Sequence, residues 1–322
     1  MTTQTSRDCP NRSISVIVPA HNEEASIGAL LRGLVRDAAP GEISVVVACN
    51  GCTDRTAEIA RTFGPSVTVL EIPAPSKRHA QRAGDAVARG FPRAYVDADV
   101  TTTLNDLREL AGRLEDGRIL ATAPARRLDT TGTDWVVTRY YRVWEQLPQV
   151  REGLFGRGVV MVSHAGAKRI LEIPDVMSDD LAMSEVFAPG EREIVHSATA
   201  TISVPRTARD LLRRRVRIAT GNAQADHLGI RRSGTSTSWR VLVRVVRSSP
   251  SSIPDVFVFL VVALAARTAS RRHVRSGDFT TWLRDESSRG GRPPNSGGGH
   301  DLSDAWTDES PHGEDHGKRE QP

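Results

Sequence analysis

The chain has 322 residues, 39% of them hydrophobic, which is enough for one large or two small domains with a buried core. Its formal net charge is +4, and three cysteines, an odd number, do not make a disulfide framework. Residues 1–13 lack an apolar stretch, so we expect no secretory signal and a reducing, cytoplasmic location.

Apolar, β-branched runs alternate with amphipathic helical patterns over residues 14–114. The runs Ile14–Val18 and Ile43–Ala48 are continuous, which is typical of strands buried on both faces. Further strands are expected at 67–72 and 94–97, and helices at 27–35, from about 53 to 63, at 76–89 and at 104–114. This alternation predicts an α/β fold with a mostly parallel sheet flanked by helices.

Polar loops follow the predicted strands at 19–24, 49–54, 73–77 and 97–101. In open α/β sheets the ligand binds outside the carboxyl ends of the strands, so we expect these loops to form one site. In the last of them, Asp97 and Asp99 stand one residue apart, a spacing that suits a divalent cation bridging the protein to a diphosphate. The same tripeptide also occurs in solvated turns, but its position at a strand end favours the metal site.

Two further groups of residues suggest chemistry. Asp179 and Asp180 form a second acidic pair, which either supplies a general base or caps a helix after Pro174. Eleven arginines lie between Arg206 and Arg247, which indicates either a phosphate or lipid partner or a solvated helix face. The glycine-rich segment Gly153–Gly158 is interpreted as a flexible active-site loop or a plain turn.

The composition divides the chain into four parts. We expect a flexible lead-in at 1–12, a main domain at 13–222, a helical and membrane-associated extension at 223–286, and a disordered tail at 287–322 rich in Gly, Pro and Ser. Within the extension, Val256–Ala266 is strongly apolar but shorter than the roughly 20 residues that cross a bilayer. With arginines after it, this segment is interpreted as an interfacial helix or as a core helix.

Several of these segments resemble motifs of the family 2 glycosyltransferases. The resemblance covers about residues 13–222 and rests on Ser15–Glu24, Val45–Thr56, Ser76–Gly84, the Asp-X-Asp motif at Asp97–Asp99, and Asp179–Leu181 as an acceptor motif with Asp in the usual Glu place. It implies a GT-A fold and the transfer of a sugar from a nucleotide-diphosphate sugar to a hydroxyl acceptor, with inversion and with Mg²⁺ or Mn²⁺. A UDP-sugar is favoured over a GDP-sugar as donor.

The resemblance also assigns roles to residues. Asp180 would be the catalytic base, and Asp97 and Asp99 would hold the metal. Binding of the nucleotide-sugar would involve Pro19, Ala20, Asn22, Glu23, Asn50, Lys77, Asp97, Ala98 and Asp99. The acceptor or phosphate region would contain Asp179, Gly156, Arg157, Arg214 and Arg217.

Two departures from the family pattern bear on the nucleotide base and on the mode of transfer. Cys49 and Asn50 stand where the family often has two aspartates, which leaves the nucleotide base open. The family's Gln-x-x-Arg-Trp motif is absent, and Arg213–Arg217 lacks the Trp. This favours non-processive transfer, in cell-envelope, lipid or polysaccharide glycosylation.

Alternative functions belong to other classes. A sugar-nucleotide pyrophosphorylase would need a glycine-rich, basic loop after the first strand, which Pro19–Asn22 is not. A catalytically inactive nucleotide-sugar-binding scaffold stays open. Nucleic acid is not expected as a partner, because aromatic residues are scarce in the basic stretch. The inner face of the cell membrane is retained as an additional partner surface.

Overall fold

The computed structural model describes residues 13–174, 179–227, 229 and 239–275. The predicted lead-in at 1–12 and tail at 287–322 lie outside the described residues, as do parts of the predicted extension at 230–238 and 276–286. The statements on structure below refer to the described residues.

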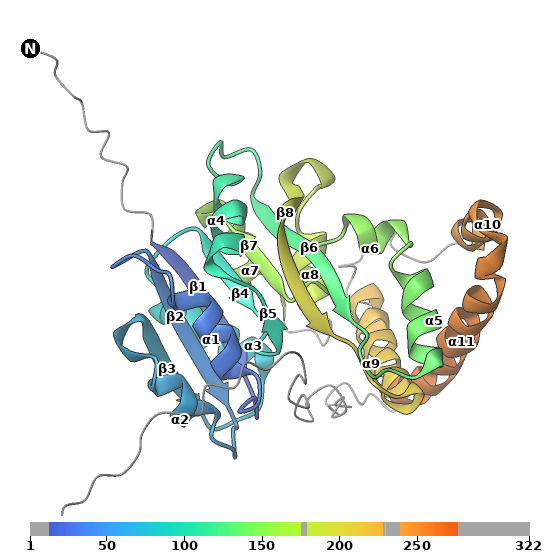
Figure 1. The fold of residues 1–322 in the computed structure, drawn as a ribbon, viewed down its shortest axis with the longest axis horizontal. Helices are drawn as coiled ribbons and strands as arrows, with labels where there is room; N and C mark the ends of the chain where they lie inside the picture. Colours follow the sequence, from blue (N-terminus) through green and yellow to red (C-terminus); the bar gives the residue numbers. More distant parts are fainter. Residues whose placement is uncertain (1–12, 175–178, 228, 230–238, 276–322) are drawn as a thin grey trace, which may run out of the picture. The chain divides into compact units, whose positions relative to one another are not determined.

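An eight-stranded sheet forms the centre of the fold, with the strand order β3-β2-β1-β4-β7-β6-β8-β5 (Figure 1). The strands are β1 (Ile14–Ala20), β2 (Ile43–Asn50), β3 (Val67–Ile72), β4 (Arg93–Val96), β5 (Val100–Thr101), β6 (Ala121–Asp129), β7 (Val159–Val162) and β8 (Arg192–Ser203). The first four are mutually parallel, as the alternating sequence pattern predicts. Strand β7 runs antiparallel to both of its neighbours, β4 and β6, so the complete sheet is mixed rather than mostly parallel.

Helices flank this sheet, and the predicted α/β class is confirmed. They are α1 (Ile27–Val35), α2 (Thr56–Arg61), α3 (Lys77–Val87), α4 (Leu104–Gly112), α5 (Trp135–Trp144), α6 (Pro148–Glu152), α7 (His164–Leu171), α8 (Asp179–Glu185), α9 (Ala208–His227), α10 (Trp239–Ser248) and α11 (Ile253–Arg275). Short 3-10 turns lie at Gly64–Ser66, Pro189–Glu191 and Pro250–Ser252. Polar residues fix several helix starts: Ser76 accepts a bond from the His79 N–H, and Thr103 forms a capping box with Asp106.

Strand β1 shows why the first strands are apolar throughout, since all seven of its residues are buried. Val16 and Val18 belong to a core cluster shared with α1, α2 and α4. Ile17 faces the other side of the sheet, in a cluster with residues of α7 and α8. Helix α3 also packs on this side, because a Cβ built on Gly84 would lie 2.5 Å from Cγ2 of Ile17. Burial on both faces explains the absence of hydrophobic alternation.

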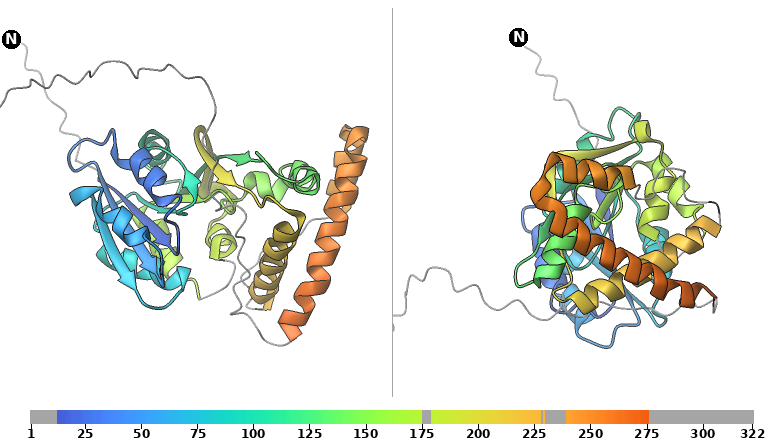
Figure 2. Two further views of the ribbon diagram at one scale, coloured as in Figure 1. Left: turned by 60° about the horizontal axis from the view of Figure 1, so that its bottom comes forward. Right: turned by 90° about the vertical axis from the view of Figure 1, so that its right-hand side faces the viewer.

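A third cluster holds the C-terminal helices together. It joins α5, α9, α10 and α11 around buried residues that include Tyr140, Leu211, Val256 and Phe259. The rings of Tyr140 and Phe259 stack with their centroids 5.0 Å apart. Figure 2 shows α11 running alongside α5 and α9, and residue 222, the predicted domain boundary, lies within α9.

Helix α11 is longer than its apolar sequence run predicts. It has 23 residues, and among the described residues Pro250–Arg271 is the stretch long and apolar enough to cross a membrane, with mean hydropathy 1.7. Core helices of soluble proteins pass the same test, and 39% of this stretch is buried. The expectation of a segment too short to span a bilayer was therefore wrong in its length. Length and composition alone do not show that the helix spans a membrane.

Two phenylalanines of α11 allow a matched test of this packing. We expect Phe259→Ala to lower the free energy of unfolding by roughly 3–5 kcal/mol, because it leaves a cavity beside Tyr140. Phe257 lies two residues away with 67% of its surface exposed, so Phe257→Ala should change stability little. Urea unfolding followed by circular dichroism measures both, and equal losses in the two variants would contradict the docking of α11 on α5.

Candidate active site

The loops that follow β1 and β2 are joined by hydrogen bonds at the carboxyl edge of the sheet. The Asn22 Oδ1 accepts the Thr53 N–H at 2.8 Å, and the Glu23 N–H donates to Thr56 Oγ1 at 2.7 Å. The Glu24 N–H donates to Asp54 Oδ2 at 3.1 Å. Asn22 has a φ of +53°, a left-handed conformation that asparagine tolerates better than most residues. These bonds bring together the residues of both loops that are predicted to bind the nucleotide-sugar, and the two loops form one wall of the candidate site.

Asn50 is turned into this wall and not toward solvent. Its side chain is buried and its amide donates to the carbonyl oxygens of Ala20 at 2.8 Å and Ala48 at 3.4 Å. Pro19 and Ala20 are buried at the same place. Asn50 therefore shapes the loop that replaces the family's acidic pair.

Cys49 and Cys52 form a hydrogen-bonded pair in the same wall. The hydrogen bond from Cys49 lowers the pKa of Cys52 to about 6, against the effect of burial, and the Asn22 N–H adds to the shift. The same bond and burial raise the pKa of Cys49. Cys52 is thus the more acidic thiol of the pair, and it lies beside the predicted nucleoside pocket.

Lys77, the first residue of α3, connects the two acidic sites. Its Nζ lies 2.9 Å from Asp97 Oδ1, at the end of β4, and 3.1 Å from Asp180 Oδ1, on α8. Two carboxylates predicted for opposite sides of the reaction therefore share one ammonium group. All three side chains are partly buried, with exposed fractions of 24% for Lys77, 32% for Asp97 and 42% for Asp180.

The surroundings of Lys77 shift the pKa values of the two carboxyl groups in opposite directions. Burial raises the pKa of Asp97 to about 7, helped by repulsion from Asp180 and Asp99 and opposed by Lys77. Burial would also raise the pKa of Asp180, but Lys77, Arg217 and Arg214 hold it below its usual value. Asp180 is consequently ionised at neutral pH, as a general base must be.

The glycine-rich loop fixes the position of Asp97. The Asp97 N–H donates to the Gly158 carbonyl oxygen at 2.8 Å. Gly158 has a φ of +67°, and a Cβ there would lie 2.2 Å from Cγ2 of Val100. A glycine is required at this position both for its backbone conformation and for the close approach of Val100.

Arg157 holds the base of this loop. Its side chain is buried and donates to four backbone carbonyl oxygens, those of Gly153, Pro124, Val150 and Arg151. Burial lowers the pKa of Arg157 to about 9. These contacts direct the guanidinium group into the protein and not toward an acceptor substrate. The sequence-based placement of Arg157 in the acceptor region therefore gains no support from the structure. Gly156 lies beside it, with a φ of +62°.

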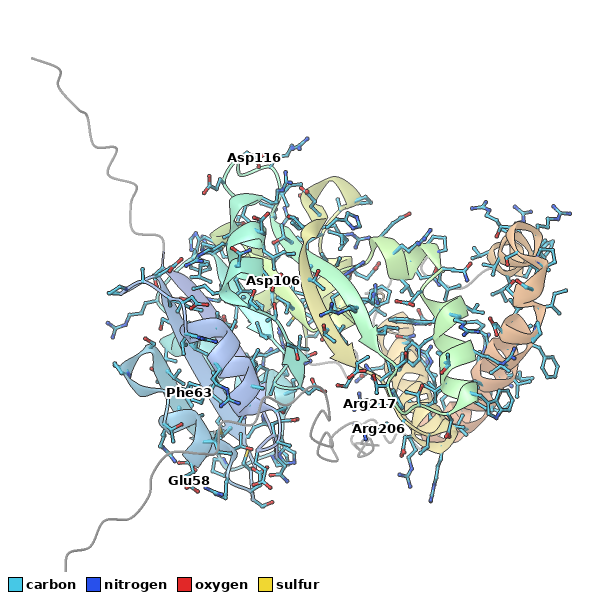
Figure 3. The ribbon with its side chains drawn as sticks, in the orientation of Figure 1. Glu58, Phe63, Asp106, Asp116, Arg206 and Arg217 are labelled. Carbon is cyan, nitrogen blue, oxygen red and sulfur yellow. The ribbon has the colours of Figure 1, made fainter. Side chains whose placement is uncertain are left out.

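Helix α9 places Arg214 and Arg217 near Asp180, close enough to influence its pKa. Figure 3 labels Arg217 on this helix. Arg214 also donates to the Ser203 carbonyl oxygen at 3.4 Å. Asp179 is the first residue of α8, and its side chain lies outside the described residues.

A small cavity of about 20 Å³ lies between the two acidic sites. Its lining includes Lys77, Asp97, Asp180 and two residues that sequence analysis missed, Gln81 and Met183. Gln81 is buried, and its Oε1 has no hydrogen-bond partner among the described residues. The spacing of Lys77 and Gln81, four residues apart on one helix, places both on the same face and was the available signal.

Asp97 and Asp99 offer the hard oxygen ligands that Mg²⁺ and Mn²⁺ prefer. No group of three or more His, Cys, Asp or Glu side chains suited to a metal occurs in the described part of the chain. Two carboxylates at the mouth of the sheet fit a cation whose remaining ligands come from a diphosphate and water, as is usual for Mg²⁺.

The Cys52 pKa predicts unusual thiol reactivity. Alkylation of Cys52 by iodoacetamide should rise with pH around an inflection near 6, because the thiolate is the reactive form. Cys49→Ser replaces the sulfur that donates to Cys52 and should therefore change this inflection. If the substitution removes the hydrogen bond altogether, the inflection should move toward about 8.5, the value of an ordinary thiol. Mass spectrometry of the Cys52 peptide separates it from the other cysteines, and a wild-type inflection near 8.5 would contradict the geometry.

Comparison with known proteins finds a family match for the part of the chain that carries the loops after β1, β2 and β4. Residues 15–170 match the family described as "Glycosyl transferase family 2". A 103-residue segment is 37% identical to a 4,4'-diaponeurosporenoate glycosyltransferase of Staphylococcus aureus (strain bovine RF122 / ET3-1). That match covers 31% of this chain and 27% of the relative's length.

Solved structures share the fold at low sequence identity. A mannosyltransferase from Pyrobaculum calidifontis, in complex with GDP-Man and Mn²⁺, is similar with a TM-score of 0.54 and 18% identity, over 83% of this chain and 79% of that one. A glucosyl-3-phosphoglycerate synthase from Mycobacterium tuberculosis, in complex with Mn²⁺, UDP-glucose and phosphoglyceric acid, gives 0.51 and 21%, over 69% and 82%. The resemblance seen in the sequence is thereby confirmed: residues 15–170, just under half of the chain, match glycosyltransferase family 2, and the chain has the GT-A fold.

Proposed function

We propose that this chain transfers a sugar from a nucleotide-diphosphate sugar to a hydroxyl group of an acceptor. The observation that carries the proposal is the contact of Lys77 with both Asp97 and Asp180. It places a carboxylate suited to the leaving-group side and one suited to the acceptor side around a single cavity. A pyrophosphorylase-like reaction is not favoured, because the loop after β1 lacks the basic, glycine-rich character that it needs.

The donor would lie along the carboxyl edge of β1, β2 and β4. We assign the nucleoside to the wall made by Pro19, Ala20, Asn22, Glu23 and Asn50, and the diphosphate to Asp97, Ala98, Asp99 and Lys77. The similar mannosyltransferase structure contains GDP-Man and the similar synthase structure contains UDP-glucose, which supports a nucleotide-sugar donor. We keep a UDP-sugar as the first choice and a GDP-sugar as the second.

Asp97 and Asp99 would hold Mg²⁺ or Mn²⁺, and the Mn²⁺ in those two relatives supports such use. When bound, the cation offsets the negative charge that develops on the departing nucleoside diphosphate. Lys77 contributes positive charge at the same place. The buried Oε1 of Gln81 is suited to accept a hydrogen bond from a sugar hydroxyl.

Asp180 would remove the proton from the attacking hydroxyl group. Its lowered pKa keeps it ionised, and we retain the inversion that the family resemblance implies. Arg214 and Arg217 face the same region and would favour an acceptor that carries negative charge. We place the reaction in the cytoplasm, at the inner face of the cell membrane, as one non-processive step of envelope, lipid or polysaccharide glycosylation.

Loss of the proposed metal ligands should abolish turnover. We expect Asp97→Asn and Asp99→Asn to lower the rate of nucleotide release from a panel of UDP- and GDP-sugars by about 100-fold or more. EDTA should have the same effect on the wild type. Asp116→Asn is the matched control, because Asp116 (labelled in Figure 3) is exposed and is not among the residues that line the cavity. Full activity of both variants in EDTA would refute the metal role.

The raised pKa of Asp97 gives this binding a pH dependence. A cation binds the carboxylate and not the carboxylic acid, so protons compete with the metal below about pH 7. The Mn²⁺-dependent rise in melting temperature with UDP should therefore increase as pH rises through about 7. Asp97→Asn should remove this pH dependence.

Replacement of the proposed base should separate binding from transfer. Asp180→Asn removes the proton acceptor but keeps the shape of the side chain, so we expect transfer to fall by about 100-fold to 10,000-fold. The donor-induced rise in melting temperature should persist. Undiminished transfer by this variant would overturn the base assignment, and failure of every donor to stabilise the wild type would point to a different ligand class.

A further inference from the structure

The outward side of α11 is an exposed apolar surface. Five large side chains make up this α11 outer face, with exposed fractions between 48% and 67%: Ile253, Phe257, Leu260, Val261 and Leu264. Their spacing of four, seven, eight and eleven residues from Ile253 places them on one stripe of the helix. In Figure 2, the right-hand view shows α11 and α10 on the side of the molecule that faces the viewer. Soluble monomers rarely expose an apolar patch of this kind without a partner.

The opposite side of α11 packs against the rest of the protein. Val256, Phe259, Val262 and Ala266 are buried in the cluster with α5 and α9 or beside it. Asp255, the one acidic residue of α11, is buried and pairs with Arg139 at 3.0 Å. A helix crossing a bilayer on its own would have to give up this packing and the ion pair of Asp255 with Arg139. The structure therefore favours a helix that lies along a surface.

Positive charge lies at the C-terminal end of the apolar stripe and on the neighbouring helix α10. Arg267 and Arg271 continue the exposed side of α11 toward its end. Helix α10 has exposed Arg240, Arg244 and Arg247, and Trp239 at its start is 69% exposed. Helix α10 contains no acidic residue. An apolar stripe with arginines at its edges and an exposed Trp complements the headgroup region of an anionic leaflet.

We propose that the α11 outer face, with the arginines of α10, docks the protein onto an anionic phospholipid bilayer, with α11 parallel to the membrane plane. The apolar side chains enter the boundary between headgroups and acyl chains, and the arginines pair with lipid phosphates. Because α9 packs against α11 and bears Arg214 and Arg217, docking brings the acceptor side of the proposed site toward the headgroups. The docking itself needs no donor or metal, so its failure is distinguishable from failure of the proposed function.

Flotation of the full chain with lipid vesicles tests this surface. The protein should bind vesicles of phosphatidylcholine and phosphatidylglycerol, bind phosphatidylcholine alone much more weakly, and be released by high salt or alkaline carbonate. The double variant F257S/L264S should bind at least about tenfold more weakly at unchanged melting temperature. The matched control V87S/L171S removes two exposed apolar side chains from other helices and should bind like the wild type.

Three results would overturn the docking itself, and a fourth would overturn its orientation. The first is absence of binding to anionic vesicles, and the second is equal binding by wild type and F257S/L264S. The third is a stable dimer in light scattering that F257S/L264S dissociates and that does not bind vesicles, because the face would then be a contact between two copies. Resistance to carbonate extraction would instead show a spanning helix and refute the parallel orientation. The variant R240Q/R244Q should weaken binding to anionic vesicles and leave the weak binding to phosphatidylcholine alone unchanged.

Discussion

The ammonium group of Lys77 is the interaction on which the proposed active site depends. It lies within 3.1 Å of carboxylates from two segments that are more than eighty residues apart in the chain. Without a cation between them, Asp97 and Asp180 would repel each other in a partly buried cavity, where charge is poorly screened. The same ammonium group helps to keep Asp180 ionised, while Asp97 remains poised between its two protonation states.

The mixed half of the sheet makes this contact possible. Strands β1 to β4 are parallel and deliver their loops to one edge, but Asp180, Arg214 and Arg217 come from helices after β7. Because β7 is antiparallel to β4, the glycine-rich loop before it arrives at the end of β4, where Gly158 bonds Asp97. Helix α8 then faces the same cavity with Asp180 and Met183. The donor and acceptor halves are thus joined by backbone and not only by side chains.

The C-terminal helices extend the structure from this cavity to an outer surface. Helix α9 has arginines near Asp180 on one side and packs against α11 on another. Helix α11 is buried where it meets α5 and α9 and apolar where it meets solvent. The sequence periodicity of α11 does not reveal this arrangement, because a helix that is apolar on both sides has no strong 3.6-residue pattern.

The sequence by itself determined the order of the first strands and helices, because strands buried on both faces leave unbroken apolar runs and helices leave a 3.6-residue period. It also indicated the family and most of the candidate site, since these loops follow strand ends directly. Only the tertiary structure decided the antiparallel placement of β7, the inward turn of Asn50, the burial of Arg157 and the role of Gln81. Each depends on contacts between residues far apart in the chain, which local periodicity does not record. The length and the two unlike faces of α11 were decided in the same way, by the helices that pack against it.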